Sequence, residues 1–373
     1  MIVMLYRHMG KTGKQVSAIG FGVMRFAEED YKKRPEKCAE ILLRAQELGI
    51  NYFDTAPGYC EDHSEGIVGR ALRQMKEKPY VSTKCGLWNA KTADEAYAKV
   101  QKSLERFSID KITFYNLWCI KTVDEYREMI KPGGIYEGIL RAKEEGLIEH
   151  ICCSVHIDGE GLAKVVADGK VEAVTLGYNA LNFAYRRAGV TACYDAGLGI
   201  VVMNPLGGGT IPQNEEKFSF LKRNPQESMV HAALRFLIGQ KEITVALPGP
   251  ATMAELEECV AAADREYEVT EEMLHALSGQ LKSELNTLCT GCAYCDSCPE
   301  GIPVPQLIEA YNNFFLKDDF DQVKSRLKYH WGISPELARK CTRCGVCEPL
   351  CTQKLPIIER LAEIAKIEVD EAD

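Results

Sequence analysis

Eight of the sixteen cysteines lie close together near the carboxyl end of the chain. They form two runs: Cys289, Cys292, Cys295 and Cys298, then Cys341, Cys344, Cys347 and Cys351. A tight loop can bring thiolates at this spacing onto neighbouring irons of one cubane, so three cysteines of each run supply three corners of a 4Fe–4S cluster. Zinc sites also use thiolates, but zinc ribbons usually contain isolated Cys-x-x-Cys pairs.

The fourth ligand of each cluster must come from outside its own three cysteines. In two-cluster ferredoxins the last cysteine of each run binds the other cluster. By the same exchange, we expect one cluster on Cys289, Cys292, Cys295 and Cys351, and the second on Cys341, Cys344, Cys347 and Cys298. The remaining eight cysteines are predicted to be buried small apolar residues rather than reactive thiols, with Cys60 and Cys85 left open as reactive candidates.

A carboxylate, a phenol and an ammonium group follow two predicted strands. Residues 51–54 end in Asp54, Tyr59 lies five residues later, and residues 80–84 end in Lys84. Lys84 beside Tyr59 would lower the pKa of the phenol, and Asp54 would keep Lys84 charged. A phenol tuned in this way can give a proton to a carbonyl oxygen while hydride arrives at the carbon. Taken singly, these residues also fit a plain ion pair and a packing aromatic.

Eight short apolar runs alternate with amphipathic helical segments before residue 264. Short runs so dense in apolar residues are typical of strands buried on both faces. They cover residues 19–24, 51–54, 80–84, 112–117, 148–154, 173–176, 199–203 and 243–247. Eight such units predict a closed (β/α)8 TIM barrel of class α/β over residues 1–265, with its active site at the carboxyl ends of the strands. An open doubly wound sheet is the alternative, but no Gly-x-Gly-x-x-Gly follows the first strand.

The alternation stops at about residue 265. Helical patterns cover residues 271–285 and 305–315 and begin again at residue 357, with the two cysteine runs between them. Residues 266–373 are therefore predicted to form a C-terminal, mostly helical, ferredoxin-like iron–sulfur domain.

Composition excludes several classes of function. The 373 residues carry a net charge of −9, which argues against a general nucleic-acid binder. The chain contains no apolar run of the roughly 20 residues that a membrane span needs, and its amino-terminal apolar run is too short for a signal peptide. Because the cytosol keeps thiols reduced, clustered cysteines in a chain of this length indicate metal ligands. We expect a soluble cytoplasmic protein with no membrane or nucleic-acid partner.

The sequence resembles the aldo/keto reductase family, in particular its branch with a C-terminal ferredoxin-like domain. The resemblance is carried by residues 6–22, Tyr-Phe-Asp-Thr-Ala at 52–56, Ser-Glu at 64–65, Ser-Val-His at 154–156, Pro-Leu-Gly-Gly-Gly at 205–209 and the two cysteine runs. It implies a TIM barrel, descent from nicotinamide-dependent carbonyl reductases, and an Asp–Tyr–Lys–His catalytic tetrad. Asp54, Tyr59 and Lys84 match three of the four tetrad positions.

The chain departs from the family pattern in two places. Trp118 aligns with the tetrad histidine, and an indole donates one hydrogen bond but cannot relay a proton; His156 is the nearest candidate substitute. The residues that the resemblance places around a nicotinamide cofactor are Ser154, Thr175, Met203, Pro205, Leu206, Gly207 and Gly249. Thr175 stands where the family usually has Gln. Residues 247–255 contain no cation to pair a 2′-phosphate, and Glu255 would repel it.

The leading prediction is an oxidoreductase that acts on a small carbonyl or alcohol substrate, with two clusters for electron transfer or for structure. NAD(P)H is the expected cofactor. A nicotinamide passes two electrons and a 4Fe–4S cluster one, so conducting clusters would need a converter such as FMN and a redox partner protein. The alternatives are a redox-neutral lyase or isomerase on the same barrel mouth, and a non-catalytic electron-transfer protein.

Overall fold

The computed structural model describes residues 4–263, 267–280, 288–289 and 291–368. The chain divides into two compact units, Met1–Leu206 with Leu221–Thr270, and Gly207–Phe220 with Glu271–Asp373. The domain boundary predicted between residues 265 and 266 lies outside the described residues and stays a prediction.

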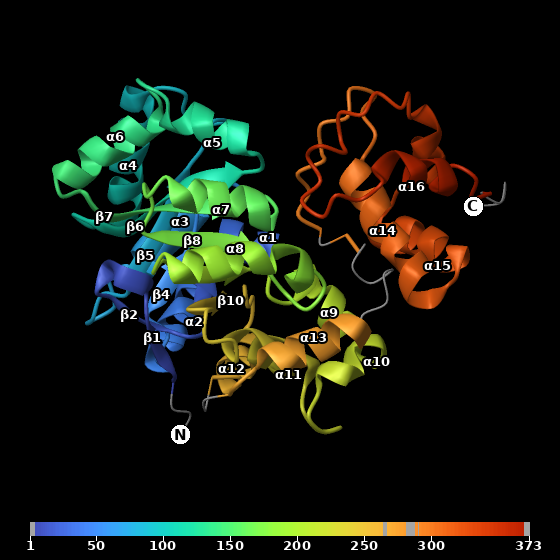
Figure 1. The fold of residues 1–373 in the computed structure, drawn as a ribbon, viewed down its shortest axis with the longest axis horizontal. Coiled ribbons are helices and arrows are strands. Elements are labelled where there is room, and N and C mark those ends of the chain that lie inside the picture. The colour runs from blue at the N-terminus through green and yellow to red at the C-terminus, as the bar shows by residue number, and fades with distance from the viewer. Residues whose placement is uncertain (1–3, 264–266, 281–287, 290, 369–373) are drawn as a thin grey trace. The chain divides into compact units, whose positions relative to one another are not determined.

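Eight parallel strands form the centre of the first unit (Figure 1). They are β3 (Phe21–Gly22), β4 (Tyr52–Asp54), β5 (Tyr80–Cys85), β6 (Ile112–Ile120), β7 (Ile148–Val155), β8 (Ala173–Gly177), β9 (Gly199–Met203) and β10 (Val245–Leu247). Each strand pairs with the next one along the chain. A parallel bridge between Ile19 and Ala246 joins the segment before β3 to β10, and Gly20 N donates to Ala246 O at 2.9 Å. The predicted (β/α)8 barrel is confirmed.

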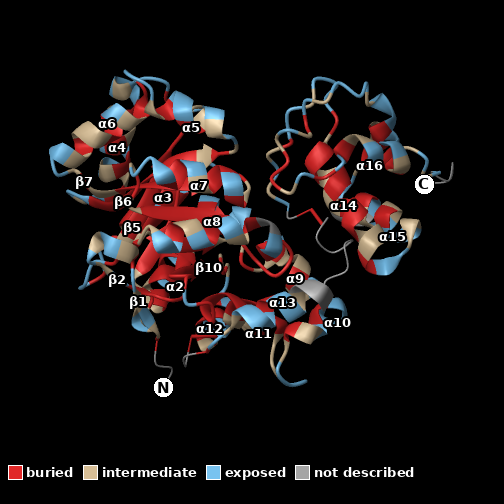
Figure 2. Cartoon of the chain, viewed as in Figure 1, coloured by how far each residue is buried: buried red, intermediate tan, exposed pale blue. Residues whose placement is uncertain are grey.

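Helices cover the outside of the barrel, with buried residues on the side that faces the strands (Figure 2). They are α1 (Glu28–Lys33), α2 (Pro35–Glu47), α3 (Ser64–Leu72), α4 (Ala93–Phe107), α5 (Val123–Ile130), α6 (Ile135–Glu144), α7 (Gly159–Ala167), α8 (Phe183–Asp195), α11 (Met229–Ile238) and α12 (Met253–Ala261). In α4, Ala96, Val100 and Phe107 are buried at helical spacing, which sets one face against the sheet. Thr92 and Glu95 close its first turn in a reciprocal capping box.

An antiparallel hairpin packs against the interior of the barrel. It consists of β1 (Tyr6–His8) and β2 (Gln15–Ser17). Met9, which follows β1, is fully buried in one cluster with the barrel residues Phe114 and Val201. The hairpin therefore contributes apolar contacts to the barrel core as well as backbone pairing of its own.

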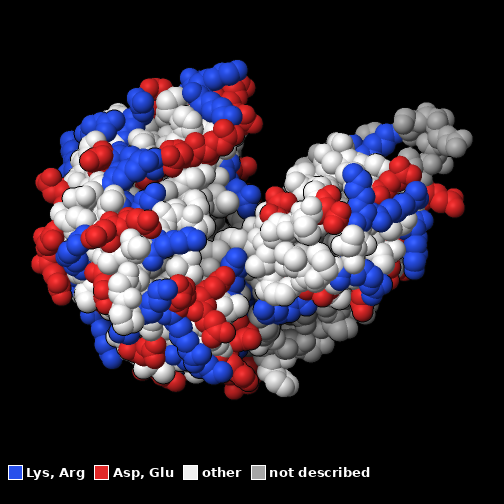
Figure 3. All heavy atoms as spheres, turned by 90° about the horizontal axis from the view of Figure 1, so that it is seen from above, with Lys and Arg blue, Asp and Glu red and all other residues white. Residues whose placement is uncertain are grey.

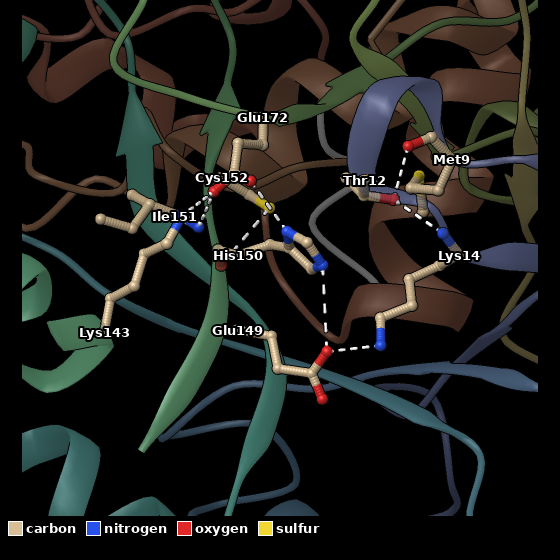
Figure 4. A network of polar contacts seen from close by, with 9 residues as sticks. All are labelled: Met9, Thr12, Lys14, Lys143, Glu149, His150, Ile151, Cys152 and Glu172. Carbon is tan, nitrogen blue, oxygen red and sulfur yellow. Dashed lines mark hydrogen bonds and ion pairs between the residues drawn. The ribbon is translucent and has the colours of Figure 1, made fainter. Parts of the chain in front are cut away.

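A polar network lies at the amino ends of β7 and β8 (Figure 4). Glu172 accepts from His150 Nδ1 at 2.8 Å and from Lys143 Nζ at 2.5 Å, while Lys14 pairs with Glu149 at 2.5 Å. Burial alone would raise the pKa of Glu172, but the hydrogen bonds from His150 and Lys143 outweigh burial and lower it to about 2. Polar groups at this end of a TIM barrel serve stability rather than catalysis.

The second unit is mostly helical around the cysteine runs. Its helices are α9 (Thr210–Gln213), α10 (Glu215–Phe218), α13 (Glu271–Gln280), α14 (Val304–Lys317), α15 (Phe320–Ser325) and α16 (Ile357–Ile364). α14 and α16 correspond to the helical patterns predicted at 305–315 and from 357, and α13 covers the described part of 271–285. The apolar faces of α14 and α16 share one core with four buried cysteines: Cys289, Cys295, Cys347 and Cys351.

The surface carries both signs of charge. Lys and Arg side chains are interspersed with Asp and Glu over the face shown in Figure 3. Within the described parts of the chain, no helix has the length and apolar character needed to cross a membrane.

Candidate active site and cluster sites

Asp54 and Lys84 form a buried ion pair at the carboxyl ends of β4 and β5. Lys84 Nζ lies 2.5 Å from Asp54 Oδ1, and the two side chains are 1% and 5% exposed. Lys84 also donates to Thr55 O at 2.7 Å, and Ser82 Oγ donates to Asp54 Oδ2 at 2.7 Å. Burial lowers the pKa of Lys84, and the Asp54 carboxylate opposes that shift. The structure thus brings these two predicted residues together and fixes the ammonium in one position.

Tyr59 lies on the loop between β4 and α3, beside this pair. Lys84 Nζ is 5.4 Å from the centroid of the Tyr59 ring. Burial, and after it the Asp54 carboxylate, raise the pKa of Tyr59, while Arg25 opposes the shift. The sequence predicts that Lys84 lowers the pKa of Tyr59, but the pKa is raised. The reason is that Asp54 neutralises the ammonium and burial disfavours a phenolate. A raised pKa keeps the phenol protonated at neutral pH, as a proton donor requires.

The backbone that follows Tyr59 is left-handed at three successive residues that are not glycine. Cys60, Glu61 and Asp62 have φ angles of 50°, 49° and 74°. Such a conformation costs an L-residue roughly 1–2 kcal/mol, so contacts elsewhere must hold the loop in place.

Asp62 is the side chain that ties this loop to the barrel helices. Its Oδ1 accepts from Gly58 N at 3.0 Å, and both of its carboxylate oxygens accept from the Arg106 guanidinium of α4. Arg106 also donates to Glu65 Oε2 at 2.9 Å, and Glu65 is 1% exposed. This bridge fixes the backbone on both sides of Tyr59.

Trp118, on β6, packs edge to face between two other aromatic rings. Its ring lies 5.6 Å from Tyr59 at 84° and 5.0 Å from Trp88 at 67°, a favourable aromatic arrangement. Trp118 is 8% exposed and Trp88 62% exposed. The indole predicted to stand in place of the family histidine therefore lies next to the phenol.

His156 directly follows β7 and is buried. Its backbone N donates to Ile120 O at 2.7 Å. Burial, followed by the charges of Arg186 and Lys121, lowers the pKa of the imidazole well below its ordinary value. The ring is therefore neutral at neutral pH and does not act as an imidazolium acid. Its part in the reaction stays a prediction.

Six of the seven residues predicted around a nicotinamide belong to the first unit and lie in or just after β7 to β10. They are Ser154, Thr175, Met203, Pro205, Leu206 and Gly249. Ser154 and Thr175 are register neighbours on β7 and β8, and both are buried. The seventh, Gly207, begins the 3-10 turn Gly207–Gly209 of the second unit. Its three glycines have φ angles of 62°, 68° and 94°, a backbone that glycine adopts without strain.

The helix after β10 carries a carboxylate at its amino end. Glu255 N donates to Thr252 Oγ1 at 3.2 Å, and Glu255 Oε2 accepts from Ala251 N at 2.7 Å. The Thr252 hydroxyl therefore caps the first turn of α12, and the Glu255 carboxylate lies at its amino end, where it binds the backbone just before the helix. A 2′-phosphate placed here would meet like charge instead of a cation.

Arg25 is a site residue that no motif in the sequence reveals. A Cβ atom on Gly249 would lie 3.1 Å from Arg25 Cγ, and the Arg25 charge acts on Tyr59. Arg25 thus stands between the segment after β10 and the phenol. Its place just after the first barrel strand is the signal that points to it.

One pocket of the second unit is lined by four cysteines from both runs. They are Cys298, Cys341, Cys344 and Cys347, the set predicted for the second cluster. The apolar side chains of Val304 and Leu361 line the same pocket. Four thiols around an apolar pocket are a donor set that fits a 4Fe–4S cluster.

The other four cysteines form a second group. Burial, and then the neighbouring thiols of Cys292, Cys295 and Cys351, raise the pKa of Cys289. Gly291 N donates to Cys289 Sγ and Leu355 N to Cys351 Sγ, both at 3.4 Å. Thr352 Oγ1 lies 3.3 Å from Cys292 Sγ, so the end of the second run reaches the first. Hydrogen bonds to sulfur are a feature of iron–sulfur sites.

The two cysteine runs share one backbone repeat. Positive φ angles occur two and four residues after the first cysteine of each run: 66° and 60° at Gly291 and Ala293, 59° and 79° at Arg343 and Gly345. Alternating left-handed residues of this kind turn backbone N–H groups toward a shared anion, as at many iron–sulfur sites. The donor sets, the burial and this repeat fit two such clusters.

Comparison with known proteins agrees with both units. A model of the aldo/keto reductase family matches residues 18–279, which is more than half of the chain. The chain belongs to the aldo/keto reductase family. A model of a 4Fe-4S dicluster domain matches residues 288–358. This aldo/keto reductase is therefore an oxidoreductase with an iron–sulfur domain that follows the barrel in the sequence.

Several relatives of this aldo/keto reductase carry names that describe an activity. NADH-specific methylglyoxal reductase of Escherichia coli is 27% identical over 192 residues, which cover 47% of this chain and 58% of that protein. L-galactose dehydrogenase of Arabidopsis thaliana is 25% identical over 288 residues, which cover 69% of this chain and 87% of that protein. A holo-form aldo-keto reductase from Bacillus halodurans has a TM-score of 0.62 at 22% identity and covers 75% of this chain and 97% of its own; this likeness shows the fold alone.

Proposed function

We propose that this aldo/keto reductase interconverts a small carbonyl compound and its alcohol, with Tyr59 as the acid and base. The observation that carries the proposal is the buried Asp54–Lys84 pair beside the Tyr59 ring. A nicotinamide, when bound, supplies or accepts the hydride. Tyr59 gives its proton to the carbonyl oxygen, or takes it back from the alcohol. Although its pairing with Asp54 keeps Lys84 from lowering the pKa of Tyr59, its ammonium lies 5.4 Å from the centroid of the ring on which the phenolate forms and offsets part of that negative charge.

NAD is the nicotinamide that the site favours over NADP. The carboxylate of Glu255 occupies the amino end of α12, so a 2′-phosphate there would be repelled. One relative is named an NADH-specific methylglyoxal reductase, which supports the same choice. Ser154, Thr175 and the backbone after β9 and β10 would hold the rest of the cofactor. NADPH that supports faster turnover than NADH at equal concentration would contradict this assignment.

The clusters can exchange electrons with a nicotinamide only through a group that converts two-electron into one-electron transfer. Nicotinamide chemistry moves two electrons and a 4Fe–4S cluster moves one, so conducting clusters require a flavin. We expect FMN and a redox partner protein only in that case, and neither where the clusters brace the domain. Anaerobic purification, visible spectroscopy and extraction of bound cofactors measure iron, flavin and nicotinamide response together. A colourless, zinc-containing protein would overturn the cluster assignment.

Replacing Tyr59 by Phe tests the catalytic role directly. The change removes the hydroxyl that carries the proton and leaves the ring, so turnover should fall by roughly 10²–10⁴-fold with no loss of folded protein. Turnover is measured as NADH oxidation with small aldehydes and ketones, methylglyoxal among them, and as NAD reduction with sugars such as L-galactose. Tyr97→Phe, on the outer helix α4, is the matched control. Equal turnover of Tyr59→Phe and the control would remove Tyr59 from this role.

A further inference from the structure

The last helix of the second unit carries an arginine on its buried face. Arg360 of α16 is only 3% exposed. Its guanidinium carbon lies 4.8 Å from the ring centroid of Phe315 and 5.3 Å from that of Tyr311, both on α14. Within the described residues, Nε and Nη1 of Arg360 have no hydrogen-bond partner. A buried cation with unused donors is costly unless an anion lies against it.

Arg360 lies against the core that holds two of the cysteines, because the Tyr311 ring below its guanidinium belongs to the same buried cluster as Cys289 and Cys351. The Glu363 carboxylate already accepts a hydrogen bond from the Tyr311 hydroxyl. The two thiols belong to the cysteine group assigned to the first cluster, which holds Cys292 and Cys295 as well. Once those thiols bind iron, the first cluster adds negative charge to the core on which the guanidinium lies.

We propose that Arg360 is the charge partner of the first cluster and raises its reduction potential. The proposal rests on the proposed assignment of Cys289, Cys292, Cys295 and Cys351 to the first cluster. Reduction adds one negative charge to a cluster, so a fixed buried cation stabilises the reduced form more than the oxidised form.

The second cluster group has a different environment. Among the described residues of the second unit, Arg360 is the one buried Lys or Arg. Cys344, in the second group, is exposed, so solvent reaches that group. Loss of the Arg360 charge should therefore change one cluster and leave the other unchanged.

The test compares Arg360→Gln, which removes the charge, with Arg360→Lys, which keeps it. Arg339→Gln is the control, because Arg339 lies in the same unit and its side chain is 51% exposed and paired with Glu336. Iron is counted after anaerobic purification, and midpoint potentials are measured by titration with dithionite followed by electron paramagnetic resonance. In Arg360→Gln the midpoint potential of one cluster should fall by about 59 mV. For a one-electron couple this shift corresponds to a tenfold change in the equilibrium constant for reduction.

The outcomes distinguish a failure of the Arg360 proposal from a failure of the cluster assignment on which it rests. Wild-type, Arg360→Lys and Arg339→Gln proteins should keep both potentials near their original values. Loss of half the iron from Arg360→Gln but not from Arg360→Lys would also support a charge partner. Full iron and two unchanged potentials in Arg360→Gln would overturn the proposal for Arg360 alone. A wild-type protein without 4Fe–4S clusters would overturn the cluster assignment itself.

Discussion

At the scale of single residues, the position of Tyr59 depends on Asp62. Asp62→Ala removes the bond to Gly58 N and the fork to Arg106, so the strained left-handed run keeps its contacts through Glu61 but is no longer tied to α4. We expect kcat to fall by about 10–100-fold, since small displacements of a catalytic group have effects of this size. Asp62→Asn keeps an acceptor for Gly58 N, so its kcat should fall less than that of Asp62→Ala. Steady-state kinetics beside melting curves measures both effects.

The control for this loop is an exposed aspartate in an ion pair elsewhere on the barrel. Asp124→Ala breaks a pair with Arg127 that is largely exposed and should leave kcat unchanged. If Asp62→Ala melts earlier than wild type but turns over at the wild-type rate, the Asp62 bridge stabilises the fold without positioning Tyr59.

Sequence reasoning at this scale succeeds where strand ends decide the geometry. Asp54 and Lys84 end neighbouring strands, so their pairing follows from the order of the barrel. The pKa direction of Tyr59 does not follow in this way, because burial exceeds the effect of any one neighbour. Arg25 is missed for a related reason: its partners lie more than thirty residues away in the chain.

At the scale of elements, the network around Glu172 should make the barrel sensitive to acid. The Glu172 pKa is lowered to about 2 from 4.5, so its stabilisation is complete above 4.5 and is lost as the pH falls toward 2. Because the Glu172 side chain is 35% exposed, screening reduces the effect to on the order of 1 kcal/mol. Glu172→Gln should therefore lower the free energy of unfolding at pH 7, and the difference from wild type should shrink toward pH 3. Urea unfolding at several pH values measures it.

The control for the network is a surface carboxylate with one exposed partner, such as Glu128 beside Lys131. Glu128→Gln should leave the pH dependence as in wild type. A constant difference between Glu172→Gln and wild type across this pH range would show that the network contributes packing rather than charge.

The elements themselves are predictable where the signal is local. All eight strands and the helices α14 and α16 follow from apolar density and periodicity, which neighbouring residues alone determine. The left-handed run at Cys60, Glu61 and Asp62 is not predictable in this way, since no glycine or Asn-Gly pair marks it. It exists because Arg106, on another helix, holds it in place.

At the scale of the whole molecule, the two units should respond differently to loss of iron. Four cysteines are part of the apolar core of the second unit, so the clusters are a structural element of that core and their binding contributes folding free energy. The barrel has its own core, in which Met9, Tyr52 and Val245 are at most 1% exposed. Removal of iron should therefore unfold the cysteine-bearing residues 288–368 of the second unit and leave the barrel folded.

Limited proteolysis of the full chain after anaerobic chelation distinguishes these responses. Cleavage should appear between residues 288 and 368, while a fragment that contains residues 4–263 persists with an unchanged melting temperature. Cys344→Ser gives a milder version, because it removes one exposed ligand of the second cluster and leaves the first group complete. We expect that variant to hold half of the wild-type iron and to be partly protected from proteolysis between residues 288 and 368. Joint unfolding of barrel and cluster unit on chelation would instead mean that iron stabilises the chain as one cooperative fold.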